Sequence, residues 1–203
     1  MKTGVQVPRV KSRSIRDIEE VAQKFLRDFA PNCLKRPERT PVAQFFDRDL
    51  YRQFRFAANV ENLPPGIEGL TDCGAKTVSL AEHVYEGLCS HDGRSRFTTC
   101  HEIGHVVLHA KALARRKTRF SDGSESGLVL KRRSELHAFE DPEWQADSFS
   151  AALLMPSPMV IELLRKVGRS QLIPTMVGVF AVSFAAAERR LKTIGRTSVK
   201  KRR

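Results

Sequence analysis

Residues 99–114 have the sequence TCHEIGHVVLHAKALA. Apolar residues recur through this stretch at the spacing of a helix, so we predict a helix here, with Thr98 or Thr99 as its cap. Inside it, His101 and His105 are the two ends of an H-E-x-x-H motif. Residues four apart lie on one face of a helix, so both imidazoles can reach one cation. The motif therefore predicts a metal centre on this helix.

The chemistry of the motif favours zinc and a hydrolytic reaction. Two imidazoles and one carboxylate are a common donor set of catalytic zinc sites, which keep one position open for water. Glu102 lies one step round the helix from His101, where it can take a proton from that water without binding the metal. We therefore predict His101 and His105 as ligands and Glu102 as the catalytic base. His109, one turn further on, is expected to support the site rather than to bind the metal.

A third ligand must come from elsewhere in the chain. The metzincin pattern is excluded, because Leu108 and Lys111 occupy the positions of its glycine and its third histidine. Glu143 and Asp147 are four apart on a second predicted helix that begins at Pro142. In such a pair, one carboxylate can bind zinc and the other can accept the N–H of a ligating histidine. We expect Glu143 to be the ligand and Asp147 the support, although the helix dipole alone also favours acids in a first turn.

The rest of the chain is predicted to be helical around a small sheet, which gives an α+β fold. Further helices are expected over residues 14–29, 42–56, 157–168, 174–180 and 184–194, and strands over residues 68–71 and 77–84. We expect residues 1–13 to be a flexible basic N-terminus and residues 14–156 the metal-binding domain. Residues 157–195 are expected to form a helical segment, read as either a helix-turn-helix or a packing pair, before a basic tail over 196–203. Residues 115–137 are predicted to be a mobile loop.

The formal net charge of +12 points to an acidic partner or to nucleic acid. The excess is concentrated in residues 2–16, in 115–119 with 131–133, and in 196–203. Such clusters attract phosphates through nonspecific contacts, but solvated tails and a loop would have the same composition, and both interpretations stay open. Residues 177–187 form the longest apolar run, about half a membrane span, so no membrane association is expected. Four cysteines without a C-x-x-C pair fit a reducing cytoplasm.

Two motifs of the chain follow one another in a specific order. Residues 96–109 read RFTTCHEIGHVVLH, and residues 143–156 read EWQADSFSAALLMP. Together they resemble the ImmA/IrrE family of metallopeptidases, and with the flanking helices the likeness covers roughly residues 14–195. Asp147 stands where Asn is frequent in that family, and Ser150 where Ala is usual. Neither difference touches the predicted ligands.

The resemblance implies a small zincin-like domain followed by a C-terminal helical segment. It implies zinc held by His101, His105 and Glu143, with Glu102 catalytic. It also implies a bacterial or phage-element protein that cleaves or inactivates a helix-turn-helix repressor and so relieves repression. Two rival functions remain open, a DNA-binding regulator with a structural or vestigial zinc site and a protein that sequesters a repressor without cleaving it. The residue that polarises the substrate carbonyl is left open among three candidates, Tyr85, His91 and His137.

Overall fold

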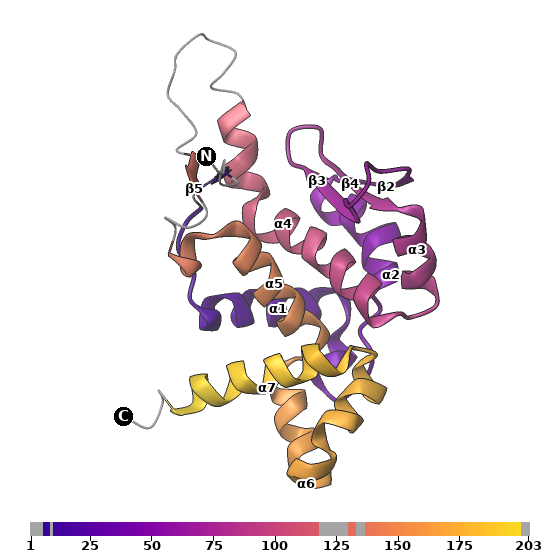
Figure 1. Ribbon diagram of the computed structural model, residues 1–203, viewed down its shortest axis with the longest axis vertical. Coiled ribbons are helices and arrows are strands. Elements are labelled where there is room, and N and C mark those ends of the chain that lie inside the picture. Colours follow the sequence, from indigo (N-terminus) through magenta and orange to yellow (C-terminus); the bar gives the residue numbers. More distant parts are fainter. Residues whose placement is uncertain (1–5, 9, 118–129, 133–136, 200–203) are drawn as a thin grey trace.

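The protein has an α+β fold in which one long helix passes between two groups of elements, a small sheet with α2 and α3 on one side and α5 and α1 on the other (Figure 1). The computed structural model describes residues 6–8, 10–117, 130–132 and 137–199. The strands are β1 (Gln6–Pro8), β2 (Ala57–Glu61), β3 (Gly69–Asp72), β4 (Thr77–Ala81) and β5 (Leu130–Arg132). The helices are α1 (Ile15–Phe29), η1 (Pro31–Leu34), α2 (Val42–Gln44), η2 (Phe45–Phe54), α3 (Glu82–Cys89), α4 (Gly93–Lys117), η5 (Ala138–Glu140), α5 (Pro142–Leu154), α6 (Ser157–Phe180) and α7 (Phe184–Val199).

The main sheet is mixed and has the strand order β2-β4-β3. β4 is central: it is parallel to β2 and antiparallel to β3, and its Val78 and Leu80 are fully buried. β3 is an edge strand and lies beside α4. The two predicted strands are confirmed, except that residues 82–84 begin α3 instead of extending β4. β2 was not predicted, because nearly all of its side chains are exposed and it lacks an alternating pattern.

Helix α4 is the centre of the molecule, with the sheet on one side and α5 and α1 on the other (Figure 1). It buries Cys100, Ile103 and Val106. On the far side of α5, the Phe25 ring of α1 meets the Phe149 ring of α5 edge-on, with centroids 6.1 Å apart. The core therefore packs around the helix that carries the histidine motif, and it fixes the direction in which the motif faces.

Two predicted helix boundaries are wrong for local reasons. α4 begins at Gly93 rather than near Thr99, because Asp92 caps it by accepting the Ser95 backbone N–H at 2.8 Å. Thr99 lies inside the helix and donates its hydroxyl to the Ser95 carbonyl at 2.8 Å. The periodic stretch 42–56 is helical, but most of it is the π-helix η2, which ends at Arg55 with a φ of 59°. By contrast, the predicted start of α1 is confirmed by a capping box between Ser14 and Asp17.

The C-terminal helices also differ in part from the prediction. α6 is interrupted at Gly168, which has a φ of 72°, close to where the first helix was expected to end. The second half of α6 includes Pro174 instead of starting there. Ser183 caps α7 through the Ala186 N–H at 3.2 Å, and α7 continues past the expected end at residue 194. No single described helix is both long and apolar enough to cross a membrane; α6 and residues 184–195, bent by 118°, meet that test only as a pair.

Part of the N-terminal segment, which the sequence predicts to be flexible, forms backbone hydrogen bonds with later parts of the chain. β1 pairs with β5 in an antiparallel ribbon, and Arg13 donates its N–H to the Phe139 carbonyl at 3.0 Å. The predicted loop over residues 115–137 likewise contains the end of α4 and all of β5. Residues 118–129 and 133–136 of that loop, and 200–203 of the basic tail, lie outside the described residues.

Side chains from the core reach across the predicted boundary at residue 156. Arg96 of α4 is buried and donates to the carbonyls of Phe180 and Ala181 at the end of α6. Arg190 of α7 donates to the Met155 carbonyl at 2.9 Å and forms an ion pair with Glu19 of α1. The helical segment 157–195 is therefore tied to the metal-binding part by two buried arginines.

Candidate metal centre

Helices α4 and α5 approach each other closely because Gly104 lies between them. A Cβ atom at Gly104 would come within 3.2 Å of the Ala146 Cα atom and of the Phe149 ring. A Cβ atom at this position would therefore require its neighbours on α5 to shift by a few tenths of an ångström. α5 begins at Pro142, as predicted, and Asp141 caps it through the Glu143 N–H at 3.0 Å. The cap and the close packing place the first turn of α5 opposite the histidine motif.

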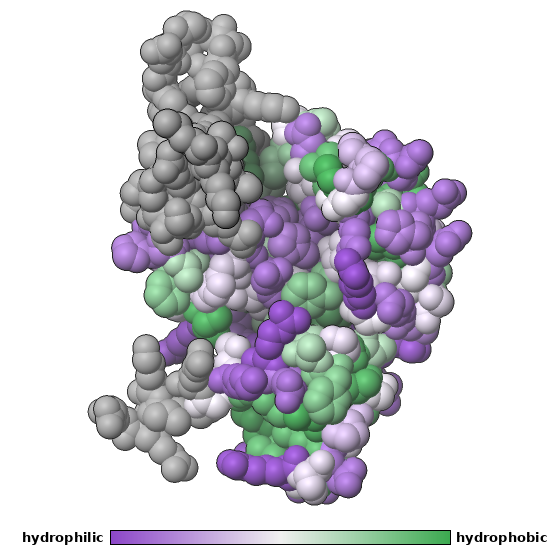
Figure 2. Space-filling view, viewed as in Figure 1, coloured by the Kyte–Doolittle hydropathy of each residue, from purple (hydrophilic) through white to green (hydrophobic). Residues whose placement is uncertain are grey.

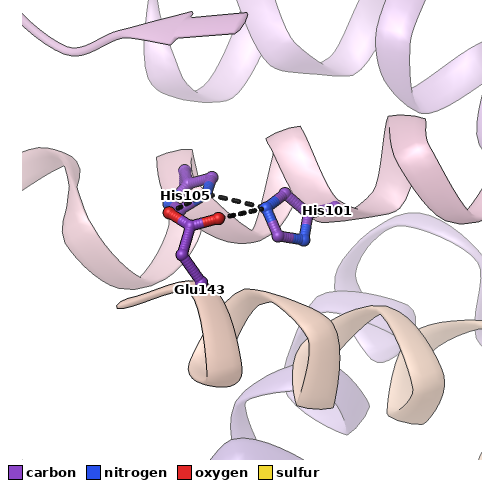
Figure 3. Close-up of side chains that lie close together, drawn as sticks. All are labelled: His101, His105 and Glu143. Carbon is purple, nitrogen blue, oxygen red and sulfur yellow. Dashed lines mark hydrogen bonds and ion pairs between the residues drawn. The ribbon is translucent and has the colours of Figure 1, made fainter. Parts of the chain in front are cut away.

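The predicted ligands come together between these two helices (Figure 3). His101 Nε2 lies 3.0 Å from His105 Nε2 and 3.2 Å from a Glu143 carboxylate oxygen. The other oxygen of Glu143 lies 3.5 Å from His105 Nε2. The three donor groups therefore all lie within 4.8 Å of one another. Two imidazoles and one carboxylate are the donor types that suit a catalytic zinc ion, so the chemistry of this set fits the metal that the sequence predicts.

His101 is held from behind by Asp147. Its Nδ1 atom lies 2.9 Å from an Asp147 carboxylate oxygen, which can only accept while it is ionised. Nδ1 therefore donates to Asp147, and Nε2, which faces Glu143 and His105, is the nitrogen that would bind a metal ion. This is the contact predicted for Asp147, a carboxylate that orients a ligating histidine.

His105 is oriented by a chain of hydrogen bonds that ends at the backbone. The Gln145 side-chain N–H2 donates to the carbonyls of Lys11 and Phe139, at 2.9 and 2.7 Å. Its Oε1 atom must therefore accept, and it lies 3.2 Å from His109 Nε2. His109 Nδ1 is then free to accept the proton of His105 Nδ1, 3.1 Å away. The chain leaves His105 Nε2 unprotonated and facing the centre.

Glu102 lies apart from this cluster, on the side of α4 that faces β3. Its side chain is buried, and Thr71 donates its hydroxyl to one carboxylate oxygen at 2.6 Å. A Cβ atom at Gly69 would come within 2.8 Å of Glu102 Cγ, so glycine makes room for the carboxylate. Glu102 therefore lies next to the histidines without joining the donor group. Sequence reasoning missed Thr71 and Gly69, because the strand that carries them gave only a weak signal.

A cleft of about 560 Å3 opens over Glu102 and His101. Residues 66–69 form one wall, and Arg94, Phe97 and Thr98 of α4 form another. The ion pair between Arg94 and Glu68 joins these two walls. Within the described residues, none of Tyr85, His91 and His137 lines this cleft. The geometry of the cleft therefore does not support any of the three as the group that polarises the substrate carbonyl.

The charges of the cluster favour a cation at its centre. Burial lowers the pKa of His101, but hydrogen bonds to Asp147 and Glu143 outweigh it and raise this pKa to about 10. Burial and the neighbouring His101 charge lower the pKa of His105 to about 4. Burial also raises the pKa of Glu102, against the hydrogen bond from Thr71. The carboxylates of Asp147 and Glu143 therefore stabilise positive charge on the imidazole of His101.

A helix carrying H-E-x-x-H, with a carboxylate supplied by the following helix, defines the gluzincin type of metal centre. The family model described as the IrrE N-terminal-like domain matches residues 84–192, more than half of the chain. The chain belongs to this family, which is the ImmA/IrrE family indicated by the sequence motifs.

Comparison with solved structures adds to the description of the fold. The protein is similar to a transcriptional regulator of Mycobacterium tuberculosis, with a TM-score of 0.56 and 14% sequence identity. The match covers 87% of this chain and 46% of the regulator, so the chain spans a little under half of that protein. At this identity the likeness shows a shared fold. A search of curated proteins finds no match.

Proposed function

We propose that this protein is a zinc-dependent endopeptidase of the bacterial cytoplasm. The observation that carries the proposal is the convergence of His101, His105 and Glu143 within 4.8 Å, with Glu102 beside His101 in the wall of one cleft. A structural zinc site needs four protein ligands and no general base, whereas this group offers three and has a buried glutamate next to it. Membership of a peptidase family supports the same reaction.

The residues of the chain divide the work of peptide hydrolysis. Zinc held by this donor set supplies a Lewis acid that makes water a better nucleophile at neutral pH and polarises a carbonyl. Glu102 accepts a proton from the attacking water and passes it to the departing amine. Its raised pKa suits a group that must both take and return a proton. Thr71 holds one carboxylate oxygen, which directs the other oxygen to the water. Asp147 and the His109–Gln145 pair keep both imidazoles in the ligating tautomer.

We further propose that the substrate is a helix-turn-helix repressor, whose cleavage relieves repression in a stress or mobile-element response. The motifs shared with the ImmA/IrrE family support this, as does the fold shared with a protein described as a transcriptional regulator. The net charge of +12 supports a role near nucleic acid, with nonspecific contacts through the basic tails.

The test is incubation of the zinc-loaded protein with the helix-turn-helix repressor encoded beside it. Glu102→Gln keeps the side-chain size and the metal ligands, so zinc content and repressor binding should stay near the wild-type values. Cleavage should fall by about 10²- to 10⁴-fold, the usual contribution of a general base. Glu82→Gln, at an exposed position on α3, is the matched control and should cleave normally.

Each rival function predicts a different result. A structural or vestigial site predicts that neither the wild type nor Glu102→Gln produces fragments. A sequestering protein predicts that Glu102→Gln still relieves repression in cells. Cleavage at the wild-type rate by a zinc-loaded Glu102→Gln protein would show that water activation does not depend on this carboxylate.

A further inference from the structure

A second pocket adjoins the cleft of the metal centre. It has a volume of about 230 Å3 and lies among α1, α4, α5 and α7. Phe97 and Asp147 line both this pocket and the cleft that contains His101 and Glu102. A chain bound across the cleft could therefore place a neighbouring side chain in the pocket. We call this space the α7 pocket.

The α7 pocket is lined by both apolar and charged side chains. Its apolar lining comes from five side chains, those of Ile15, Phe97, Trp144, Ala151 and Ala186. Its charged lining consists of two carboxylates, Glu19 and Asp147, and two arginines, Arg189 and Arg190. Both carboxylates are already engaged, because Glu19 pairs with Arg190 and Asp147 binds His101. The formal charges balance. The hydrogen-bond donors that remain in the pocket lining for an anionic ligand belong to the two arginines.

Arg190 has an unused donor. Its side chain is buried, its Nε atom donates to the Met155 carbonyl, and its Nη1 atom pairs with Glu19. In the part of the chain that the structure describes, its Nη2 atom is the one buried side-chain nitrogen or oxygen without a hydrogen-bond partner. A buried donor without an acceptor costs free energy, and a small shift of the guanidinium toward the pocket would bring this donor to an acceptor on a ligand.

Arg189 adds a second cation on the same helix. It is exposed and donates through Nε to the Ala185 carbonyl at 3.3 Å. It takes part in no salt bridge with any residue that the structure describes. Its guanidinium is therefore available to a ligand, and a planar guanidinium pairs most strongly with a carboxylate.

We propose that the α7 pocket binds a carboxylate carried on an apolar stem, and that this carboxylate is an acidic side chain of the substrate, next to the scissile bond. The stem would pack against the apolar walls, and the carboxylate would meet Arg189 and Arg190. The first half of the proposal stands on the pocket alone. The second half rests on the proposed peptidase function, so the two halves need separate experiments.

The ligand chemistry can be measured through Trp144, which lines the pocket and is the single tryptophan of the chain. The probes are phenylbutyrate and its uncharged amide, titrated into the protein while tryptophan fluorescence is recorded. We expect the carboxylate to bind about 10- to 100-fold more tightly than the amide, the usual gain from a charged hydrogen bond. Equal binding of the two probes, or no binding of either, would overturn the proposal.

Two pairs of variants locate the binding. Arg189→Glu should abolish the preference for the carboxylate, whereas Lys192→Glu, also exposed on α7 but outside the pocket, should keep it. Ala186→Phe should fill the pocket and block both probes, whereas Ala185→Phe, on the adjacent exposed position, should bind normally. If a control variant loses as much binding as the pocket variant with which it is paired, the probe binds elsewhere on the protein. That result would overturn the assignment of the ligand to the α7 pocket.

The source of the carboxylate is tested with a peptide library and the zinc-loaded protein. We expect one position beside the cleaved bond to be enriched in Glu and Asp, and Arg189→Glu to remove that enrichment. Cleavage without an acidic preference, together with probe binding, would overturn the substrate half and assign the pocket to a free carboxylate ligand. Probe binding without cleavage of any peptide would contradict the peptidase function while supporting the ligand chemistry.

Discussion

The two histidines of the candidate metal centre lie four residues apart on one helix, yet their surroundings differ. His101 is hydrogen-bonded to Asp147, a charged side chain that is 56% exposed. His105 leans on His109, which is neutral and 1% exposed, and behind it on Gln145, which is fully buried. Burial lowers the pKa of His109 to about 3, so this support stays uncharged at any ordinary pH. One ligand is supported by a charge in contact with water, the other by a dry chain of neutral groups.

The two supports differ in how much of the fold they depend on. The Asp147 contact joins neighbouring turns of α4 and α5, so it depends on two side chains alone. The Gln145 contact reaches the carbonyl of Lys11 in the N-terminal segment. The geometry of His105 therefore depends on how the N-terminus is folded against α5, and the geometry of His101 does not.

The largest effect is expected when a ligand itself is removed. His101→Ala and His105→Ala should each lose most of the bound zinc, because two donors cannot hold the ion at micromolar concentration as three do. Elemental analysis after gel filtration measures this. His83→Ala, on an exposed position of α3, is the control and should keep one zinc per chain. One zinc per chain in both His101→Ala and His105→Ala would show that these histidines do not bind the metal.

Removing the charged support should weaken zinc binding by about 10- to 100-fold, the usual cost of losing such a partner. We therefore expect Asp147→Ala to bind less tightly than wild type, but more tightly than Glu143→Ala. Asp147→Asn keeps an acceptor for His101 Nδ1 and should recover part of the loss. Since Asp147 is exposed, the gap between wild type and Asp147→Asn should narrow at high salt. A reversed ranking of Glu143→Ala and Asp147→Ala would make Asp147 the ligand.

Breaking the neutral support should also weaken zinc binding, but without a dependence on salt. Gln145→Leu leaves the Lys11 and Phe139 carbonyls without their donor, which should lower the free energy of unfolding by about 1–3 kcal/mol. Thermal unfolding measures the loss of stability. Zinc titration at two salt concentrations measures the loss of zinc affinity and its dependence on salt. A salt dependence as strong as that of Asp147→Asn would mean that the two supports do not differ as argued.

The smallest effect is expected at Cys100, the residue before His101. Its side chain packs in the hydrophobic core and is not part of the donor group, and burial raises the pKa of its thiol to about 12. Cys100→Ala should change zinc affinity by less than about twofold, because a neutral thiol is a poor metal ligand. A folded Cys100→Ala protein without zinc would show that sulfur takes part in binding.

The part of the site that could be predicted from the sequence is the part formed by residues close to one another in the chain. The spacing of His101 and His105 within one helix, and the start of α5 at Pro142, both follow from residues close in sequence. The structure brings Glu143 to those histidines, and Asp147 and His109 behind them, at the positions that helical spacing indicates. The roles assigned to these residues stay predictions until metal binding is measured.

The unpredicted parts depend on contacts between distant residues or on competition between neighbours. Gln145 and Lys11 are 134 positions apart, and Thr71 and Glu102 are 31 apart, without any periodic pattern that joins them. The start of α4 was misplaced because several residues could cap it, and only the folded chain shows that Asp92 does.

X-ray absorption at the zinc edge tests the central claim most directly, because it identifies the atoms bound to the metal. For the zinc-loaded wild type we predict two imidazole nitrogens at about 2.0–2.1 Å, oxygen donors at about 2.0–2.2 Å, and no sulfur. His101→Ala and His105→Ala should lose this signal, and Glu102→Gln should retain it unchanged. A spectrum with sulfur scattering, or with fewer than two imidazoles, would contradict a zinc site built from His101, His105 and Glu143.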